Sequence, residues 1–145
     1  MCGFRAKRPC GAALISVLVG GQASGEPMVL TAPISFWGGV SPETGMIIEK
    51  RHPQFGVSLK GKILMLPAAK GSSSGSSVLA ETLRNGTGPA AIILGSPDAI
   101  LATGALVAEA LYGVVCPVLI VNYEQFQTLE KAQNLTINGA DIQAG

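Results

Sequence analysis

The chain of 145 residues is poor in charged and aromatic side chains, which make up 13% and 5% of it. Its formal net charge is +1, without a block of basic residues. Nucleic-acid binding needs clustered Lys and Arg that neutralise phosphates, so nucleic acid is not an expected partner. Hydrophobic residues make up 48%, and with so little charge to cover the outside, part of the surface is expected to be an interface.

Long hydrophobic runs and paired cysteines are also missing. The longest apolar run near the start, residues 12–19, is far shorter than the roughly 20 residues that span a bilayer, so no membrane segment is expected. Basic residues precede this run as in a signal peptide, but two glycines interrupt it. Cys2, Cys10 and Cys116 form no CxxC pair, which argues against a disulfide framework or a zinc site. We therefore expect a cytoplasmic protein.

What is present predicts one α/β domain over residues 12–145, after a flexible extension over residues 1–11. Short apolar runs bounded by glycine or proline predict strands, and apolar residues at helical spacing predict helices. Asn138-Gly139 predicts a hairpin between residues 135 and 143. The predicted strands cover residues 12–19, 28–30, 46–48, 61–66, 90–94 and 117–121, and the predicted helices cover residues 78–83 and 101–111. This alternation indicates strands joined by crossover helices.

Two stretches between these elements are candidates for function. Residues 31–45 form a long irregular segment, and long ordered loops often carry function. Residues 71–77 read GSSSGSS and lie between a predicted strand and a predicted helix, next to Lys70. A helix N-terminus favours an anion, or a hydroxyl that loses its proton. The alternative, that these serines only cap the helix, stays open.

Two other families of glycine-rich loop do not fit. The loop lacks the GxxxxGK[ST] spacing of a phosphate-binding loop. It does match the G-x-S-x-G pattern of hydrolases, with Ser73 in the place of the nucleophile. However, the single histidine, His52, precedes this serine, whereas the hydrolase fold places its histidine after it.

Several separate motifs in the same order resemble the small-subunit family of aconitase X, over about residues 14–122. They are APISFWGGV at residues 32–40, Thr44-Gly45, His52-Pro53, KGSSSGS at residues 70–76 and Leu111-Tyr112-Gly113. The family's small subunit is similar to the fourth domain of aconitase. The resemblance therefore implies a swivelling β/β/α fold that closes over an active site built mainly by a large subunit.

The resemblance also implies roles for the serine loop. The family's proposed proton acceptor is the first serine after glycine, which here is Ser72. Gly71, Ser73 and Ser74 are candidate substrate-binding residues, and because the serines repeat, a neighbour of Ser72 is the alternative base. No metal ligand is expected in this chain, since the family's iron or iron–sulfur centre is bound by cysteines of the large subunit.

Some residues outside the loop are also candidates for a functional or a structural role. Phe36 and Trp37 are candidate substrate-binding residues, with core packing or contact with the partner as alternatives. Cys116 is expected to pack as a small apolar residue. Arg51 and Arg84 could pair with a carboxylate, but solvated surface charge is the default for both.

Two activities share this architecture, dehydration of cis-3-hydroxy-L-proline and of 5-phosphomevalonate. The FWGG motif, the triple serine and HPQFG at residues 52–56 favour hydroxyproline, so a small hydroxy acid and the large subunit are the expected partners. A swivelling carrier domain with His52 as a phosphohistidine is the alternative from another class. A third is a scaffold without chemistry of its own.

Overall fold

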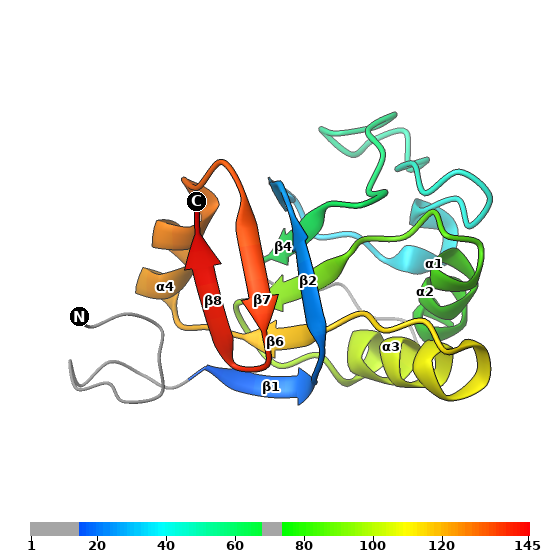
Figure 1. Ribbon diagram of the computed structural model, residues 1–145. Coiled ribbons are helices and arrows are strands. Elements are labelled where there is room, and N and C mark those ends of the chain that lie inside the picture. The colour runs from blue at the N-terminus through cyan, green and yellow to red at the C-terminus, as the bar shows by residue number, and fades with distance from the viewer. Residues whose placement is uncertain (1–14, 68–73) are drawn as a thin grey trace.

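The computed structural model describes residues 15–67 and 74–145, which form strands and helices in alternation (Figure 1). The strands are β1 (Ser16–Val19), β2 (Gln22–Gly25), β3 (Pro27–Val29), β4 (Ile63–Leu66), β5 (Ala91–Leu94), β6 (Val118–Ile120), β7 (Leu135–Asn138) and β8 (Asp141–Ala144). The helices are α1 (Phe36–Gly39), α2 (Gly75–Arg84), α3 (Ala99–Tyr112) and α4 (Tyr123–Glu130). The predicted extension over residues 1–11 lies outside the described residues.

The central sheet has the strand order β1-β6-β5-β4-β3. Strands β3 to β6 are parallel, and β1 joins the edge in the antiparallel direction. Every residue of β4 and β5 is buried, as expected of parallel strands covered on both faces. Helix α2 connects β4 to β5, and α3 connects β5 to β6. The predicted crossover helices are therefore confirmed.

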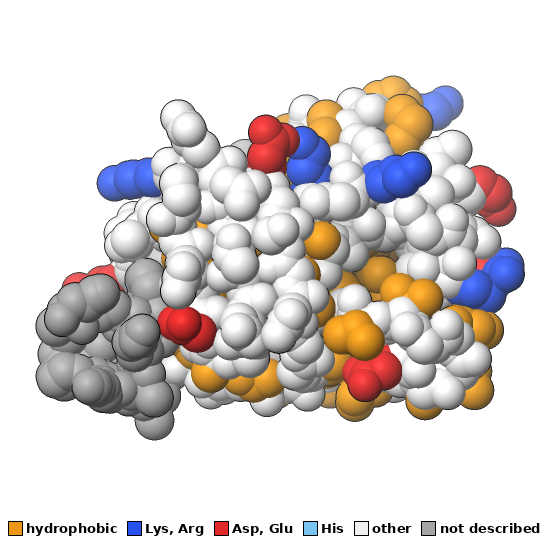
Figure 2. Space-filling model, viewed as in Figure 1, with side chains coloured by type: hydrophobic (Ala, Val, Ile, Leu, Met, Phe, Trp, Pro, Cys, Tyr) orange, Lys and Arg blue, Asp and Glu red, His pale blue; other side chains and the backbone are white. Residues whose placement is uncertain are grey.

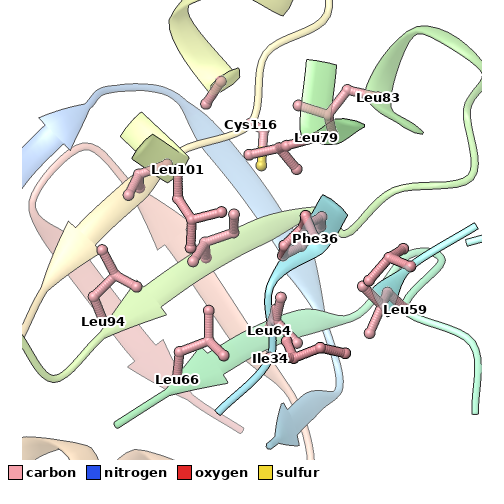
Figure 3. Close-up of a cluster of buried hydrophobic side chains, with 14 of the residues drawn as sticks. Ile34, Phe36, Leu59, Leu64, Leu66, Leu79, Leu83, Leu94, Leu101 and Cys116 are labelled. Atoms are coloured by element: carbon pink, nitrogen blue, oxygen red, sulfur yellow. The ribbon is translucent and has the colours of Figure 1, made fainter. Parts of the chain in front are cut away.

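Alternate residues of the parallel strands point into two separate hydrophobic cores. Leu64 and Leu66 point to the face covered by α1, α2 and α3, where they pack with Phe36, Leu79 and Leu101 (Figure 3). The intervening strand residues Ile63 and Met65 belong to the second core, with side chains from α4, β7 and β8. Successive side chains of a strand point to opposite faces, so a continuous apolar run serves both layers.

The second layer is a small antiparallel sheet with the order β2-β7-β8, beside α4 (Figure 1). Its hairpin turns at Gly139, as the Asn-Gly pair predicts. The sequence reading missed β2, α4 and the short α1, which lies within the segment expected to be irregular. Strand β2 reads QASG and carries no large apolar residue, while α4 has only Phe126 and Leu129 as large apolar residues facing the core.

Residues 40–60 make a long excursion that passes the end of α2. The carbonyl of Pro42 accepts hydrogen bonds from Asn85 Nδ2 (2.9 Å) and Thr87 Oγ1 (2.8 Å). The predicted strand at residues 46–48 forms only isolated bridges, Val40 with Ile47 and Met46 with Ser58. Gly45 has a φ of 73°, and a Cβ there would lie 2.0 Å from the Thr87 carbonyl oxygen. The excursion thus requires glycine at this contact.

We expect Gly45→Ala to lower the free energy of unfolding by roughly 2–5 kcal/mol, because left-handed strain adds to a clash with backbone. Gly38→Ala is the matched control, since Gly38 has a φ of 79° and no atom within 4 Å of its added Cβ. That control should lose only about 1–2 kcal/mol. Urea unfolding followed by circular dichroism measures both, and equal losses would contradict the contact with Thr87.

Candidate functional site

The carboxyl edge of the central sheet gathers the segments that follow β3, β4 and β5. At this edge α2 begins at Gly75, directly after the serine run. A Cβ on Gly75 would lie 3.8 Å from Phe36 Cβ and 3.5 Å from Ile100 Cγ2. The start of α1 and the first turn of α3 therefore pack around the first residue of α2. This convergence fixes the helix end to which the serine loop is attached.

Of the predicted loop residues, only Ser74 belongs to the described part of the chain; Gly71, Ser72 and Ser73 lie outside it. Ser74 is the N-cap residue of α2, is exposed, and its side chain makes no capping hydrogen bond. The alternative in which this serine serves as a helix cap is therefore not supported at Ser74. Its hydroxyl remains accessible at the helix N-terminus, where the dipole favours negative charge.

The two adjacent aromatic candidates have opposite environments. Phe36 is 2% exposed and packs in the core beneath α2, whereas the Trp37 side chain is 62% exposed. The structure thus supports the core-packing role for Phe36. In the core, its side chain supports the start of α2. Trp37 is displayed on the surface of the same edge, free to contact a substrate or a partner.

Two hydrogen-bonding side chains, the buried His52 and the half-buried Gln54, tie the excursion to the carboxyl end of β3 and to the segment that follows it. The Gln54 side chain accepts from the Thr31 N–H (3.0 Å) and donates to the Val29 carbonyl (3.0 Å). The Gln54 backbone N–H donates to His52 Nδ1 (3.0 Å), so Nε2 carries the proton and donates to the Ala32 carbonyl (2.9 Å). We call His52 and Gln54 the clasp. Its role is to hold the segment between β3 and α1 in place.

The clasp leaves His52 without a free ring nitrogen. Its side chain is 4% exposed, and both nitrogens are engaged. A phosphohistidine carrier needs one nitrogen open to the phosphoryl donor. This geometry therefore opposes the carrier alternative and agrees with a structural role for His52.

Sequence reasoning missed two polar residues of this edge, Gln54 and Ser35. Ser35 Oγ is buried and has no hydrogen-bond partner among the described residues. It precedes Phe36 and, like Gln54, lies inside a motif that carries the resemblance. The motifs that contain Ser35 and Gln54 were the signal in the sequence for these two residues. A motif does not show which of its side chains face inward, however.

A cavity of about 450 Å³ opens at the same edge, on the side of α4. It is lined by Val29, Leu30, Thr31, Pro67, Gly95, Tyr123, Phe126, Gln127 and Glu130. Gln127 Nε2 donates to the Tyr123 hydroxyl (2.8 Å) on its wall. Pro67 is the last described residue before the serine loop, so this cavity adjoins the loop's entry.

The two arginine candidates, Arg84 and Arg51, are exposed surface charges, as expected by default. Arg84 donates to both carboxylate oxygens of Glu81 and lies 5.9 Å from the Tyr112 ring. This hydrogen bond raises the pKa of Arg84 and lowers that of Glu81. Arg84 ends α2, roughly 14 Å from the helix start at 1.5 Å per residue, so it is remote from the serine loop. Arg51 is exposed on the excursion.

Cys116 is 0% exposed and packs in the core, which confirms its predicted role as a small apolar residue. Desolvation by burial raises the pKa of its thiol from 9.0 to about 12. Within residues 15–67 and 74–145, no group of three or more His, Cys, Asp or Glu side chains could hold a metal ion. In the same part of the chain, no helix has the length and apolar character needed to cross a membrane.

Three layers, with a small antiparallel sheet, a mostly parallel sheet and covering helices, define a β/β/α domain of the swivelling kind. The aconitase X swivel domain family matches residues 13–144, and this chain belongs to that family. The predicted family and fold class are thus confirmed.

The chain is similar to two kinds of dehydratase. It is 46% identical, over 77% of its length, to cis-3-hydroxy-L-proline dehydratase of Pseudomonas aeruginosa, and 40% identical over 86% to that of Hypocrea jecorina. It spans only 19% and 21% of those proteins, about a fifth of their length. It is also 46% identical, over 63% of its length and 70% of the relative, to the phosphomevalonate dehydratase small subunit of Methanothermobacter thermautotrophicus.

Solved structures agree with this assignment. The crystal structure of Thermococcus kodakaraensis aconitase X superposes with a TM-score of 0.75 at 32% identity. The match covers 90% of this chain and 95% of that chain.

We expect Gln54→Ala to reduce the free energy of unfolding by about 1–3 kcal/mol, because the Val29 carbonyl and the Thr31 N–H lose their partner at the end of β3. Gln22→Ala is the control: Gln22 also donates through its side-chain amide, but to Asn138 at an exposed site. It should stay within about 0.5 kcal/mol of the native protein. Chemical denaturation of both variants tests this, and a harmless Gln54→Ala would show that the clasp contributes nothing to stability.

Cys116 predicts a pH dependence of stability. Its pKa is raised in the folded state, so between pH 9 and pH 12 the unfolded thiol loses its proton while the folded one keeps it, and stability falls as pH rises. From pH 8 to pH 10 this one group should cost about 1.4 kcal/mol. Urea unfolding at both pH values should therefore show a smaller loss in Cys116→Ala than in the native protein. Equal losses would mean that the thiol titrates alike in both states.

Proposed function

We propose that this chain is the small, swivelling part of a dehydratase that removes water from cis-3-hydroxy-L-proline, with Ser72 as the base and a large subunit completing the site. The observation that carries the proposal is the match to hydroxyproline dehydratases in sequence, joined to a serine loop at the N-terminus of α2. Ser72 lies outside the described residues, so its role rests on the family resemblance and on its position before α2.

The preference for hydroxyproline has two supports. The hydroxyproline dehydratases combine 40–46% identity with coverage of 77–86% of this chain, whereas the phosphomevalonate relative at 46% identity covers 63%. Among the described residues that line the cavity beside Pro67 there is no Lys or Arg, and the one charged residue is Glu130. Phosphate sites use cationic side chains, so the described part of this wall suits an amino acid better than a phosphate ester.

In this mechanism the serine removes the proton from the carbon that bears the substrate carboxylate. A serine hydroxyl is a weak base at its ordinary pKa and must be activated. The N-terminal end of α2 would stabilise the alkoxide, since the positive end of the dipole and free amide groups lie there. Phe36 fixes that helix end from below. Loss of hydroxide from the neighbouring carbon then gives an enamine, which isomerises to pyrroline-2-carboxylate.

The departing hydroxide calls for a Lewis acid, a function that iron supplies in a metal site. The described residues of this chain offer no cluster of ligands for it. Following what the family resemblance implies, the proposal assigns the metal to the large subunit, and the chain on its own is expected to be inactive.

The test is turnover of cis-3-hydroxy-L-proline by this chain assembled with its large subunit. Ser72→Ala should lower kcat by about a hundredfold or more, because the base is lost. Its stability should change by no more than about 1 kcal/mol, the cost of a lost cap. Ser77→Ala is the control, since Ser77 is an exposed serine at the third position of α2, and it should retain native turnover.

Each other outcome has a definite meaning. If the native complex does not convert hydroxyproline, the proposed substrate is wrong, and 5-phosphomevalonate is then the substrate to assay. An assembled Ser72→Ala complex with native turnover shows that Ser72 is not the base, and Ser73→Ala becomes the next variant. Loss of activity in Ser77→Ala as well would point to damage of α2 rather than to a base.

A further inference from the structure

We propose that the large subunit docks on an apolar surface formed by Trp37, Met46, Ile48, Phe55 and Val57, here called the apolar rim. The inference rests on the proposed function, because that function requires a large subunit. It goes further by naming the surface that meets it.

The side chains of the apolar rim are large and apolar, yet they are well exposed to solvent. The exposed fractions of its side chains are 62% for Trp37, 37% for Met46, 45% for Ile48, 53% for Phe55 and 41% for Val57. Figure 2 shows hydrophobic side chains gathered over the tip of the loops that lead from α1 to β4, next to basic residues. Trp, Phe and Met are enriched in the buried centres of protein interfaces.

These side chains sit on a fixed backbone. Ile47 and Leu59 are 0% exposed and anchor the segment in the core. Ile47 exchanges hydrogen bonds with its neighbours across the turn, donating to the Val57 carbonyl (2.9 Å) and accepting from the Gly56 N–H (2.8 Å). Because the surface is already ordered, docking costs little conformational entropy. The alternation of exposed Met46 and Ile48 around buried Ile47 indicates a face built for contact.

The position of the apolar rim explains which partner covers it. Gln54, next to Phe55, is bonded to the end of β3, and Phe36, next to Trp37, packs against the first residue of α2. Both ends of the rim thus start from the carboxyl edge that holds the serine loop. A subunit that brings substrate to this loop must lie against the same edge.

A second group of exposed apolar residues lies at the other end of the helices. Leu111 and Tyr112 end α3, and Tyr112 contacts Arg84 at the end of α2. Helices α2 and α3 both begin at the carboxyl edge, so their ends point away from the serine loop. This group is therefore the matched control surface and not the proposed interface.

The relatives indicate the occupant. The chain corresponds to about a fifth of each hydroxyproline dehydratase and to most of a relative named as a small subunit. The same domain thus occurs with the remaining four-fifths in one chain or apart from it. That large remainder is the partner to which we assign the apolar rim, rather than a second copy of this chain.

The experiment measures the Kd of this chain for the large subunit by calorimetry. The double variant Ile48→Gln/Phe55→Gln should bind at least tenfold more weakly, and its turnover should recover when the large subunit is added in excess. The control Leu106→Gln/Leu111→Gln replaces two exposed side chains of α3, Leu106 in the middle of the helix (51% exposed) and Leu111 near its end (68% exposed), and it should bind within twofold of the native chain. Ser72→Ala should bind like the native chain without turnover, which separates the interface from the chemistry.

The inference is overturned if the rim variant binds like the native chain, or if the control variant is the one that weakens. It is also overturned if sedimentation shows a native dimer of this chain that the rim variant abolishes while the large subunit still binds normally. Hydrogen exchange of the unmodified chain gives an independent reading, since amides of residues 46–57 should gain protection in the complex. A complex that forms through the rim but ignores hydroxyproline leaves the interface standing and removes only the proposed substrate.

Discussion

The constraint on which the structure depends is the burial of a parallel sheet on both faces. All residues of β4 and β5 are inaccessible to solvent, and their alternate side chains enter two different cores. One face needs α1, α2 and α3, and the other needs α4 and the small sheet. With both faces covered, loops that carry chemistry can emerge only at the sheet edges. The carboxyl edge, where α2 and α3 begin, is therefore where the serine loop must be placed.

The clasp extends this constraint to a segment that has little regular structure. Residues 40–60 contain no long strand or helix, yet Gln54 bonds to the end of β3, His52 bonds to Ala32 in the segment that follows β3, and Pro42 bonds to the end of α2. The excursion is thus fixed at both edges of the domain. A buried polar group that is fully paired, such as His52, holds a loop in one arrangement, because breaking its bonds leaves an unsatisfied group. Motifs distant in the sequence, such as APISFWGGV and HPQFG, meet through these bonds.

Much of the fold could be predicted because strands such as β4 and β5 are continuous apolar runs between turn residues. The hairpin of β7 and β8 was signalled by Asn138-Gly139. Strand β2 had no apolar signal, since QASG is defined by pairing with β7 and not by its own side chains. The site was harder to predict: adjacent Phe36 and Trp37 look alike in sequence but face opposite ways. The aromatic that turns inward, Phe36, lies against Gly75, a contact made by distant parts of the chain that no local pattern shows.

An exposed Ser74 at the start of α2 and an apolar rim on the same edge suggest how assembly and catalysis are linked in the proposed enzyme. A serine alkoxide facing water gains little from a helix dipole, because water screens the interaction. Covering the edge with a large subunit removes that water and strengthens every charge interaction around the loop. The same contact that buries Trp37 and Phe55 would therefore also raise the electrostatic effect of α2 on Ser72. In this arrangement the base becomes effective only where the substrate and the metal are present.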